Sequence, residues 1–419
     1  MGKAIHLIGI GGVGMSALAQ AFLDAGHAVT GADRSLGAGD GPRTPVLAAL
    51  ERQGVRLFPD DGSGVDERTG RVVISTAVEA DNPGLLRAAQ LGIPVTHRAA
   101  ALAELLSTRR LVAVVGTCGK STVTAILGHL LASCGFDPLV VNGAQIVGWD
   151  AQGTRVGSAR KGAGTYAVAE VDESDKSLVV FKPFTAIVTN ASADHYSKEE
   201  MDAVFDAFVR NVPGPVLDGR REPIVPSDVA RTIPLPGEHN AVNAECALRM
   251  ARALGADPTA LAAAIRTFPG VDRRLQRVGD CSGTAVYDDY AHNPEKLRAM
   301  LTTLQEAFPK GVAALWRPHG YAPLRKMMDA LAEMFRATLR PQDLLLLPPV
   351  YDAGGTTDRS VNSDVLAAKL AGSPVRLVQG LEEAEMLLRA QAPAYGAFVT
   401  CGARDPGLPV LARKLAGKE

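Results

Sequence analysis

Residues 111–122 read LVAVVGTCGKST and combine an apolar run with a glycine-rich turn. The apolar run 111–115 predicts a buried strand, and residues 121–133 predict an amphipathic helix that ends before Gly135. A glycine turn between a strand and a helix directs backbone N–H groups and the positive end of the helix dipole towards one point, where phosphate binds. The segment therefore predicts a phosphate-binding loop in an α/β fold.

The side chains of this loop favour a nucleoside triphosphate. Lys120 can reach the β and γ phosphates, and the Ser121 hydroxyl can coordinate Mg²⁺. The first glycine of the usual pattern would fall at Val114, so the loop is a shortened variant, and a plain turn with a solvated lysine is the alternative. The predicted ATP-binding residues of the loop are Gly116, Thr117, Cys118, Gly119, Lys120, Ser121 and Thr122.

A second glycine turn lies near the start of the chain. Gly9, Gly11 and Gly14 match G-x-G-x-x-G, and Asp33 ends the next predicted strand, where an acid that binds ribose belongs. Read alone, this pattern is typical of an NAD(P)-dependent oxidoreductase, and that alternative stays open. The same backbone cradle fits any nucleoside diphosphate. Together the two turns suggest a nucleotide-linked substrate in one domain and ATP in the next.

Length and composition set the broad class. At roughly 150 residues per domain, 419 residues predict about three domains. A net charge of -1 excludes nucleic-acid binding driven by bulk charge. There is no apolar run long enough to span a membrane, and the five cysteines include no C-x-x-C pair, so we expect a cytoplasmic enzyme with no nucleic-acid or membrane partner, either a monomer or a weak homodimer.

Strands and helices alternate along the chain, which predicts parallel sheets with crossover helices. We place the domains at residues 1–106, 107–268 and 269–419, with a linker at 267–271. The other expected strands are 5–10, 27–33, 72–75, 166–169, 186–189, 285–287, 312–316, 344–347 and 398–400. The other expected helices are 15–25, 85–91, 240–254, 294–308 and 324–338.

Polar residues follow several of these strands. Four acids occur in residues 170–175, beginning with Glu170, and this run predicts a Mg²⁺ site or, alternatively, a solvated loop. His195 follows the next strand and is a metal or substrate ligand, or a structural histidine. Asn240 is a helix N-cap or a reader of an adenine edge. Arg273 and Arg274 are a solvated pair or clamp phosphate when domains close.

These stretches together resemble the Mur ligase family, the ATP-dependent enzymes that add amino acids to UDP-N-acetylmuramic acid, and within it the branch that adds L-alanine or recycled peptide. The resemblance covers nearly the whole chain. It is carried by residues 5–16, 75–83 and 170–175, by Asp194-His195, by His239-Asn240 with Asn243, and by residues 288–294.

The resemblance implies three domains: a Rossmann-like domain for the UDP-sugar, a central P-loop ATPase, and a Rossmann-like C-terminal domain for the incoming amino acid or short peptide. It also implies a reaction in which the muramyl carboxylate becomes an acyl phosphate that an amine then attacks. Catalysis would consist mostly of positioning and charge neutralisation. ATP and Mg²⁺ are the implied cofactors.

The resemblance also assigns roles by motif position. Lys120, His195, Glu170 and Arg274 would be catalytic, with Ser121, Glu170 and His195 as metal ligands and Asn240, Asn243 and Arg274 on ATP. The UDP-sugar would contact Gly9, Gly11, Gly12, Val13, Gly14, Met15, Ser16, Asp33 and Ser75. The incoming amino acid would contact Tyr290, His292, His319 and Arg325.

One stretch departs from the family. His319 is followed here by Gly-Tyr-Ala-Pro-Leu-Arg, whereas the alanine-adding branch has an arginine-rich stretch in this place. Those arginines help to bind the carboxylate of the incoming amino acid. A divergent Mur-like ligase with a different acceptor is therefore an alternative to the ligase that adds L-alanine.

Overall fold

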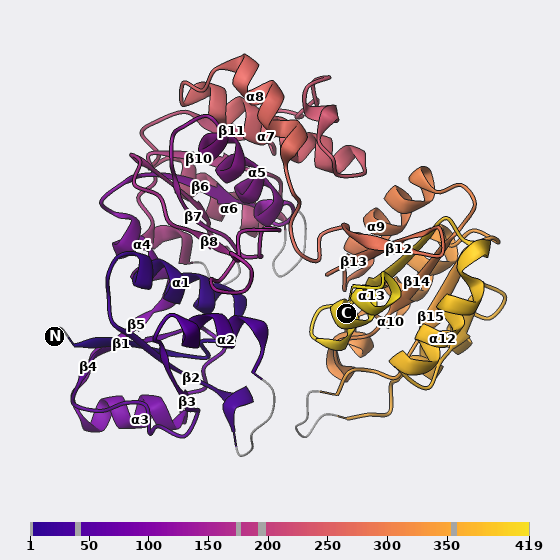
Figure 1. Ribbon diagram of the computed structural model, residues 1–419, viewed down its shortest axis with the longest axis horizontal. Helices are drawn as coiled ribbons and strands as arrows, with labels where there is room; N and C mark the ends of the chain where they lie inside the picture. The colour runs from indigo at the N-terminus through magenta and orange to yellow at the C-terminus, as the bar shows by residue number, and fades with distance from the viewer. Residues whose placement is uncertain (1–2, 38–42, 173–176, 192–197, 353–357, 419) are drawn as a thin grey trace. The chain divides into compact units, whose positions relative to one another are not determined.

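The computed structural model describes residues 3–37, 43–172, 177–191, 198–352 and 358–418 (Figure 1). Its contacts divide the chain into two compact units. The first unit comprises residues 1–234 and 239–271, and the second comprises residues 235–238 and 272–419. In the described residues, no helix is both long enough and apolar enough to cross a membrane.

The first unit begins with a parallel five-stranded sheet in the order β3-β2-β1-β4-β5. Its strands are β1 (Ala4–Ile8), β2 (Val29–Asp33), β3 (Arg56–Pro59), β4 (Thr69–Ile74) and β5 (Val95–His97). Its helices are α1 (Val13–Asp24), α2 (Pro45–Arg52), α3 (Pro83–Gln90) and α4 (Arg98–Leu106), with the short η1 (Arg34–Leu36). The strand order reverses between β1 and β4, and ligands of such sheets bind at the carboxyl ends of strands at this point.

The same unit contains a second sheet in the order β11-β10-β6-β9-β7-β8. Its strands are β6 (Arg110–Val115), β7 (Leu139–Val141), β8 (Ala159–Arg160), β9 (Tyr166–Glu170), β10 (Thr185–Val188) and β11 (Val216–Asp218). Its helices are α5 (Lys120–Ser133), α6 (Lys198–Val209), α7 (Glu238–Ala253) and α8 (Pro258–Ala264), with the short η2 (Ser177–Val180), η3 (Ala230–Thr232) and η4 (Ile265–Thr267).

Strand β6 and the helix that follows it are almost completely buried. Leu111 to Val115 are all buried, and β6 pairs in parallel with β9 on one side and β10 on the other. Helix α5, which follows β6, buries ten of its fourteen residues. Burial of each large aliphatic side chain contributes about 1.5–3 kcal/mol, so the turn between β6 and α5 is held between two firmly packed elements.

The second unit is a six-stranded sheet in the order β12-β13-β17-β14-β15-β16. Its strands are β12 (Gln276–Cys281), β13 (Thr284–Asp289), β14 (Val312–Trp316), β15 (Leu344–Leu347), β16 (Val375–Leu377) and β17 (Ala397–Cys401). Its helices are α9 (Pro294–Ala307), α10 (Tyr321–Thr338), α11 (Ser363–Lys369), α12 (Leu381–Gln391) and α13 (Gly407–Leu415), with the short η5 (Ala392–Ala394).

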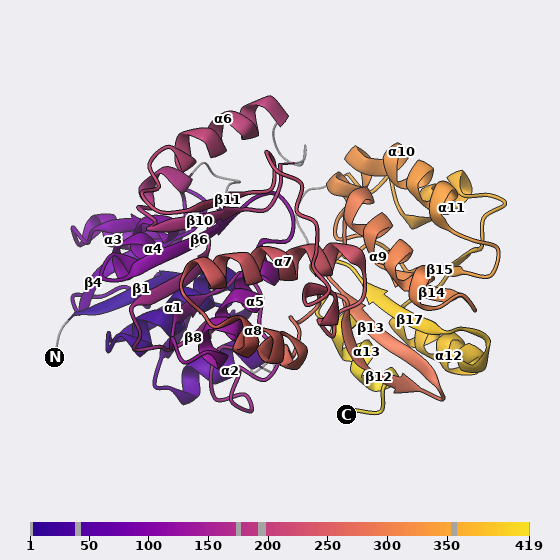
Figure 2. The same cartoon turned by 90° about the horizontal axis from the view of Figure 1, so that it is seen from above.

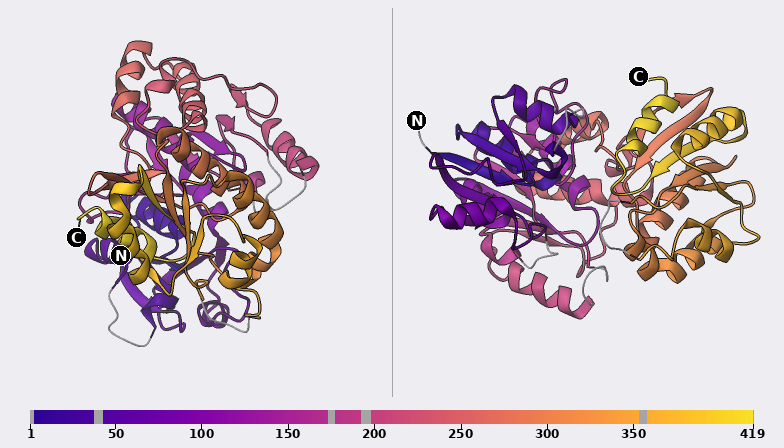
Figure 3. Two further views of the ribbon diagram at one scale, coloured as in Figure 1. Left: turned by 90° about the vertical axis from the view of Figure 1, so that its right-hand side faces the viewer. Right: turned by 90° about the horizontal axis from the view of Figure 1, so that it is seen from below.

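Helices cover both faces of this sheet. Figure 2 shows α9, α10 and α11 on one face and α12 and α13 on the other, and the right-hand view of Figure 3 shows the same two layers. Each face has its own apolar core, built around Trp316 and Phe335 on one side and Phe398 on the other. The unit is therefore a three-layer α/β structure.

The expected α/β architecture with three mostly parallel sheets is confirmed. Two edge strands differ from the expectation of parallel pairing, because β8 runs antiparallel to β7 and β12 runs antiparallel to β13. The first two sheets share one compact unit, although the sequence predicts a domain for each. The residue boundaries of the three domains stay predictions.

Candidate active site

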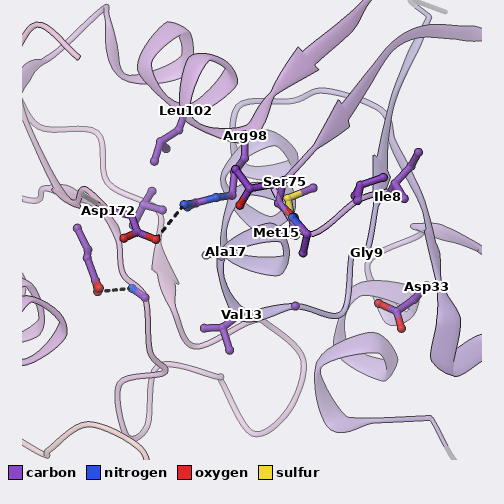
Figure 4. Close-up of a pocket in the computed structure, with 18 of the residues that line it drawn as sticks. Ile8, Gly9, Val13, Met15, Ala17, Asp33, Ser75, Arg98, Leu102 and Asp172 are labelled. Atoms are coloured by element: carbon purple, nitrogen blue, oxygen red, sulfur yellow. Dashed lines mark hydrogen bonds and ion pairs between the residues drawn. The ribbon is translucent and has the colours of Figure 1, made fainter. Parts of the chain in front are cut away.

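A pocket of about 580 Å³ opens in the first unit over the carboxyl ends of its strands (Figure 4). It lies at the reversal of strand order, where β1 and β4 end. The residues assigned to the UDP-sugar that line it are Gly9, Gly12, Val13, Gly14, Met15, Asp33 and Ser75. Gly11 and Ser16, assigned to the same group, are not among the residues that line it.

The first glycine turn has the geometry of an anion cradle. Gly9 adopts a φ of +73°, which is open to glycine at low cost. The backbone N–H groups of Val13, Gly14 and Met15 stand in the first turn of α1 and form no hydrogen bond with any residue that the structure describes. All three residues line the pocket, so these N–H groups and the α1 dipole are available to an anion such as a diphosphate.

Asp33 supports this turn. Its Oδ2 accepts a hydrogen bond from the Gly11 N–H at 2.8 Å, and its Oδ1 accepts from the Ser35 N–H and hydroxyl at 3.0 and 2.7 Å. A Cβ added to Gly11 would lie 2.8 Å from Asp33 Oδ2, so this close approach requires glycine. Ser16 is buried, and its hydroxyl donates to the Val13 carbonyl at 3.1 Å, which places it in the support of the turn.

The opposite wall of the pocket comes from the second sheet. Asn142 and Gly143 follow β7, and Glu170 and Asp172 lie at the end of β9. The Gly143 N–H donates to Glu170 Oε2 at 2.7 Å, which fixes that carboxylate beside the pocket. The pocket therefore extends from the first glycine turn to the acidic end of β9 within one compact unit.

One cation stands between these two walls. Arg98, the first residue of α4, lines the pocket, and its guanidinium lies 3.8 Å from the Asp172 carboxylate (Figure 4). Its side chain is 20% exposed.

The phosphate loop lies between β6 and α5, as the sequence predicts. Gly116 and Gly119 adopt φ values of +130° and +85°, in the region that favours glycine. Lys120 Nζ donates to the Gly116 carbonyl at 2.7 Å, and Ser121 and Thr122 are buried in the first turn of α5. The side chain of Lys120 is thus folded over its own loop.

Asn190 and Thr189, which follow β10, brace this loop. Asn190 Oδ1 accepts from the Thr117 hydroxyl at 2.7 Å and from the Cys118 N–H at 2.9 Å. Asn190 Nδ2 and the Thr189 hydroxyl both donate to the Cys118 carbonyl, at 3.0 and 2.6 Å. The middle of the loop is consequently held by the neighbouring strand.

Asn243 also packs against the phosphate loop. A Cβ on Gly119 would lie 2.6 Å from Asn243 Oδ1, and Asn240 Oδ1 accepts from Asn243 Nδ2 at 3.5 Å. Asn240 is buried inside α7, which begins at Glu238, so the N-cap interpretation of Asn240 is wrong. The structure brings Asn243 to the loop and Asn240 to Asn243.

The donors near the loop suit Mg²⁺ in part. Glu170 is paired in register with Val114, just before the phosphate loop, and its carboxylate together with the Ser121 hydroxyl offers the oxygen ligands that Mg²⁺ prefers. Within the described ranges, no cluster of three or more His, Cys, Asp or Glu side chains is arranged to hold a metal ion. Such a sparse donor set fits Mg²⁺ that is completed by phosphate oxygens and water. His195, the other proposed ligand, lies outside the described residues.

The residues assigned to the incoming amino acid lie in the second unit. The rings of Tyr290 and His292 are 5.5 Å apart, and those of His292 and His319 are 5.1 Å apart. Burial, followed by the charges of His292 and Arg404, lowers the pKa of His319 to about 4. Arg325 stands apart from these ring contacts in an ion pair with Asp358 at 2.5 Å.

The two arginines after the predicted linker also belong to the second unit. Arg273 forms an ion pair with Asp288 at 3.1 Å, so the interpretation of Arg273 as a solvated residue is wrong. Arg274 lies over the Tyr290 ring at 5.5 Å. Burial is the main cause that raises the pKa of Asp288, to about 6. The role of Arg274 on phosphate stays a prediction.

Sequence reasoning missed several residues of the site. Arg98, Asn142 and Asn190 belong to no motif to which the sequence analysis gives a role. Their common signal is position, because each follows the carboxyl end of a strand in a parallel sheet, where such sheets bind ligands.

Two protein-family models match the chain. Residues 4–110 match the catalytic domain of the Mur ligase family, and residues 273–404 match the Mur ligase glutamate ligase domain. The UDP-N-acetylmuramate–L-alanine ligase of Methylobacterium radiotolerans is 33% identical, with 95% of this chain and 93% of the relative covered. The ligase of the same name from Nitrobacter winogradskyi is also 33% identical, with 95% and 94% covered.

Solved structures give the same result. The UDP-N-acetylmuramate–alanine ligase of Thermotoga maritima superposes with a TM-score of 0.80 at 25% identity, with 99% of each chain covered. A murein peptide ligase from Psychrobacter arcticus shares the fold, with a TM-score of 0.65 at 21% identity and 100% and 98% covered. With relatives 33% identical over nearly their whole length, the chain belongs to the Mur ligase family.

Proposed function

We propose that this protein is an ATP-dependent ligase that joins L-alanine to UDP-N-acetylmuramate, a step of peptidoglycan synthesis. The observation that carries the proposal is the pocket of the first unit, which runs from an open diphosphate cradle to Glu170, next to the phosphate loop. The names of the relatives at 33% identity support the same substrates. An oxidoreductase would leave Lys120 and the phosphate loop without a role.

The sugar nucleotide binds along this pocket. The N–H groups of Val13, Gly14 and Met15 receive the diphosphate, and the Asp33 carboxylate keeps the turn in shape through the Gly11 N–H. We place the uridine end towards Asp33, beside the first glycine turn, and the muramyl end towards Glu170, beside the phosphate loop. The lactyl carboxylate is thereby brought to the side on which ATP binds.

The triphosphate binds at the phosphate loop. Lys120 exchanges the Gly116 carbonyl for the β and γ phosphates, and its charge stabilises the group in transfer. When bound, Mg²⁺ neutralises charge between the phosphate oxygens, with Ser121, Glu170 and His195 as its proposed ligands. The lactyl carboxylate is converted to an acyl phosphate, and ADP remains on the loop.

The amine of the incoming amino acid then displaces phosphate from the acyl carbon. We assign this amino acid to Tyr290, His292, His319 and Arg325 of the second unit, and we assign Arg274 to phosphate. The lowered pKa of His319 keeps its imidazole neutral at pH 7, so it adds no positive charge next to the ammonium group of the incoming amino acid. Asn240 and Asn243 are assigned to the adenine side of ATP.

We further propose the three domains 1–106, 107–268 and 269–419, a monomer or weak homodimer, and a cytoplasmic location. The five cysteines are free in the structure, which agrees with a reducing compartment.

The identity of the acceptor is the least constrained part of the proposal, because Arg325 is already paired with Asp358. An amino acid other than L-alanine, or a short peptide, is the second candidate acceptor.

Phosphate release is the direct test. The protein is incubated with ATP, Mg²⁺ and UDP-N-acetylmuramate, and single amino acids or short peptides are added in turn. We expect release of phosphate with L-alanine only when all components are present, and a product heavier by one alanine residue in mass spectrometry. ATP turnover that is independent of UDP-N-acetylmuramate contradicts the proposal, and coupling of another amino acid in place of L-alanine establishes the second candidate acceptor.

A further inference from the structure

We propose that Arg98 binds the lactyl carboxylate of the sugar nucleotide and selects substrates that carry this acid. The inference rests on the proposed function and deepens it, since no motif assigned a role to Arg98. Arg98 opens α4 directly after β5 and lines the pocket between the first glycine turn and the end of β9.

The surroundings of Arg98 leave space for its guanidinium on the pocket wall. A Cβ added to Gly14 would lie 3.1 Å from Arg98 Nη1, so glycine at this position allows the guanidinium to approach the first turn of α1. On the other side, Arg98 Nη2 is 3.8 Å from Asp172 Oδ2. The cation thus stands between the diphosphate cradle and the acidic end of β9.

The N–H donors of Arg98 form no hydrogen bond with the residues that the structure describes. A distance of 3.8 Å is an ion pair but too long for a hydrogen bond. No residue in the described part of the chain accepts a hydrogen bond from Arg98, although the side chain is only 20% exposed and a guanidinium carries five N–H donors. These N–H groups are therefore available to an anionic ligand in the pocket.

Arg34, the other arginine on the pocket wall, is different. Its side chain is 66% exposed, and it pairs with Glu79 at 2.8 Å and Asp60 at 3.4 Å. Its charge is therefore already compensated at the Asp33 end of the pocket. Arg98 is the better placed of the two for an anion deep in the site.

Position favours the carboxylate over the diphosphate as this anion. The diphosphate has the N–H groups of Val13, Gly14 and Met15, to which no described residue offers an acceptor. The lactyl carboxylate must approach Glu170 and Asp172, two like charges, in order to meet the γ phosphate. The Arg98 guanidinium lies 3.8 Å from Asp172 and can turn towards the lactyl carboxylate, which it would hold by two parallel N–H···O bonds.

The test compares two sugar nucleotides that differ in the acid. UDP-N-acetylmuramate and UDP-N-acetylglucosamine share the uridine, the diphosphate and the acetylated sugar, but only the first has the lactyl carboxylate. We expect Arg98→Met to weaken binding of UDP-N-acetylmuramate about 10- to 100-fold in calorimetric titration without ATP, with less than about a threefold change for UDP-N-acetylglucosamine. Arg98→Lys should recover part of the loss, since it keeps the charge but not the fork.

The controls separate the possible failures. Arg87→Met replaces an exposed arginine of α3 and should change neither affinity. An equal loss for both sugar nucleotides assigns Arg98 to the diphosphate and overturns the inference, as does an unchanged preference in a folded Arg98→Met protein that still binds ATP. If the unmodified protein itself shows no preference for the acid, it is the proposed function that fails.

Discussion

The first unit contains two glycine turns that join a parallel strand to a helix, and they present different surfaces. The turn at residues 9–14 opens onto a pocket with three N–H groups that form no hydrogen bond in the described part of the chain, and Asp33 supports it through the Gly11 N–H. The turn at Gly116–Lys120 is braced by Asn190 and covered by its own lysine. The first turn is therefore open to a diphosphate as it stands. At the phosphate loop, Lys120 must leave the Gly116 carbonyl before a triphosphate can bind.

The largest expected effect concerns Lys120, because the phosphate loop contains this cation and the first glycine turn contains none. Lys120→Met should lower kcat about 1,000-fold or more, because the transferring phosphoryl group loses its fixed positive charge. Binding of UDP-N-acetylmuramate should be unchanged, since it depends on the other turn. Phosphate release and calorimetric titration measure the two effects, and Lys182→Met, at an exposed lysine of the same unit, is the matched control. Residual phosphate release near the unmodified rate contradicts the assignment of the ATP site.

The second largest effect is expected at Glu170, which we assign to the Mg²⁺ of the ATP site and not to the first glycine turn. Glu170→Gln keeps an oxygen that can accept from the Gly143 N–H but removes the charge offered to Mg²⁺. We expect the Mg²⁺ concentration for half-maximal activity to rise about 10- to 100-fold. Glu199→Gln, in the exposed first turn of α6, should leave it unchanged. An unaltered Mg²⁺ titration in the Glu170 variant removes this residue from the metal site.

A smaller effect is expected from the acid that supports the first turn. Asp33→Ala removes the acceptor of the Gly11 N–H and of Ser35, so the turn loosens and its N–H groups lose their alignment. The Kd of UDP-N-acetylmuramate should rise about 10-fold, while that of ATP stays within about twofold. Asp61→Ala, at a nearby acid that does not line the pocket, serves as the control. Equal weakening of both nucleotides would show that the turns are not independent.

The smallest effect is a difference in acid sensitivity between the strands that carry the turns. Burial lowers the pKa of His6 in β1 to about 4, against the opposing influence of Asp60 and Asp66, whereas Leu111 to Val115 of β6 include no titratable group. A lowered histidine pKa means that the unfolded state binds more protons between pH 6.5 and 4, so stability falls as the pH drops through this range.

The expected loss from His6 is about 0.7 kcal/mol in the free energy of unfolding between pH 7 and pH 6. Denaturant unfolding at the two pH values measures it, and the difference between the unmodified protein and His6→Gln isolates it from His319, which titrates in the same range. Identical pH dependence in both proteins would show that His6 is not held neutral by burial.

The sequence predicted those parts of the fold that depend on interactions between residues close together in the chain. The strand before each glycine turn and the helix after it were predicted within about two residues, because apolar periodicity and helix-ending glycines act locally. The antiparallel edge strands β8 and β12 could not be predicted. β8 has two residues, and β12 reads QRVGDC, which has neither an apolar run nor the strict alternation of polar and apolar residues that is typical of a strand.

Some residues of the site could be predicted from local motifs, and others could not. The glycines, Lys120 and Asp33 follow from motifs whose chemistry is local to one turn. Arg98, Asn142 and Asn190 acquire their positions only when separate strands are brought together, and a single arginine after a strand has no spacing rule that marks it. The joint pocket between the two sheets is likewise a product of packing, which no local pattern encodes.

Simultaneous binding of both nucleotides tests the central claim most directly. The protein is saturated with a non-hydrolysable ATP analogue and Mg²⁺, and UDP-N-acetylmuramate is then titrated in a calorimeter. Two separate anion cradles predict one further sugar nucleotide per chain with an affinity equal to or tighter than that without the analogue. Competition, in which the apparent Kd of UDP-N-acetylmuramate rises in proportion to the analogue concentration, would contradict the account.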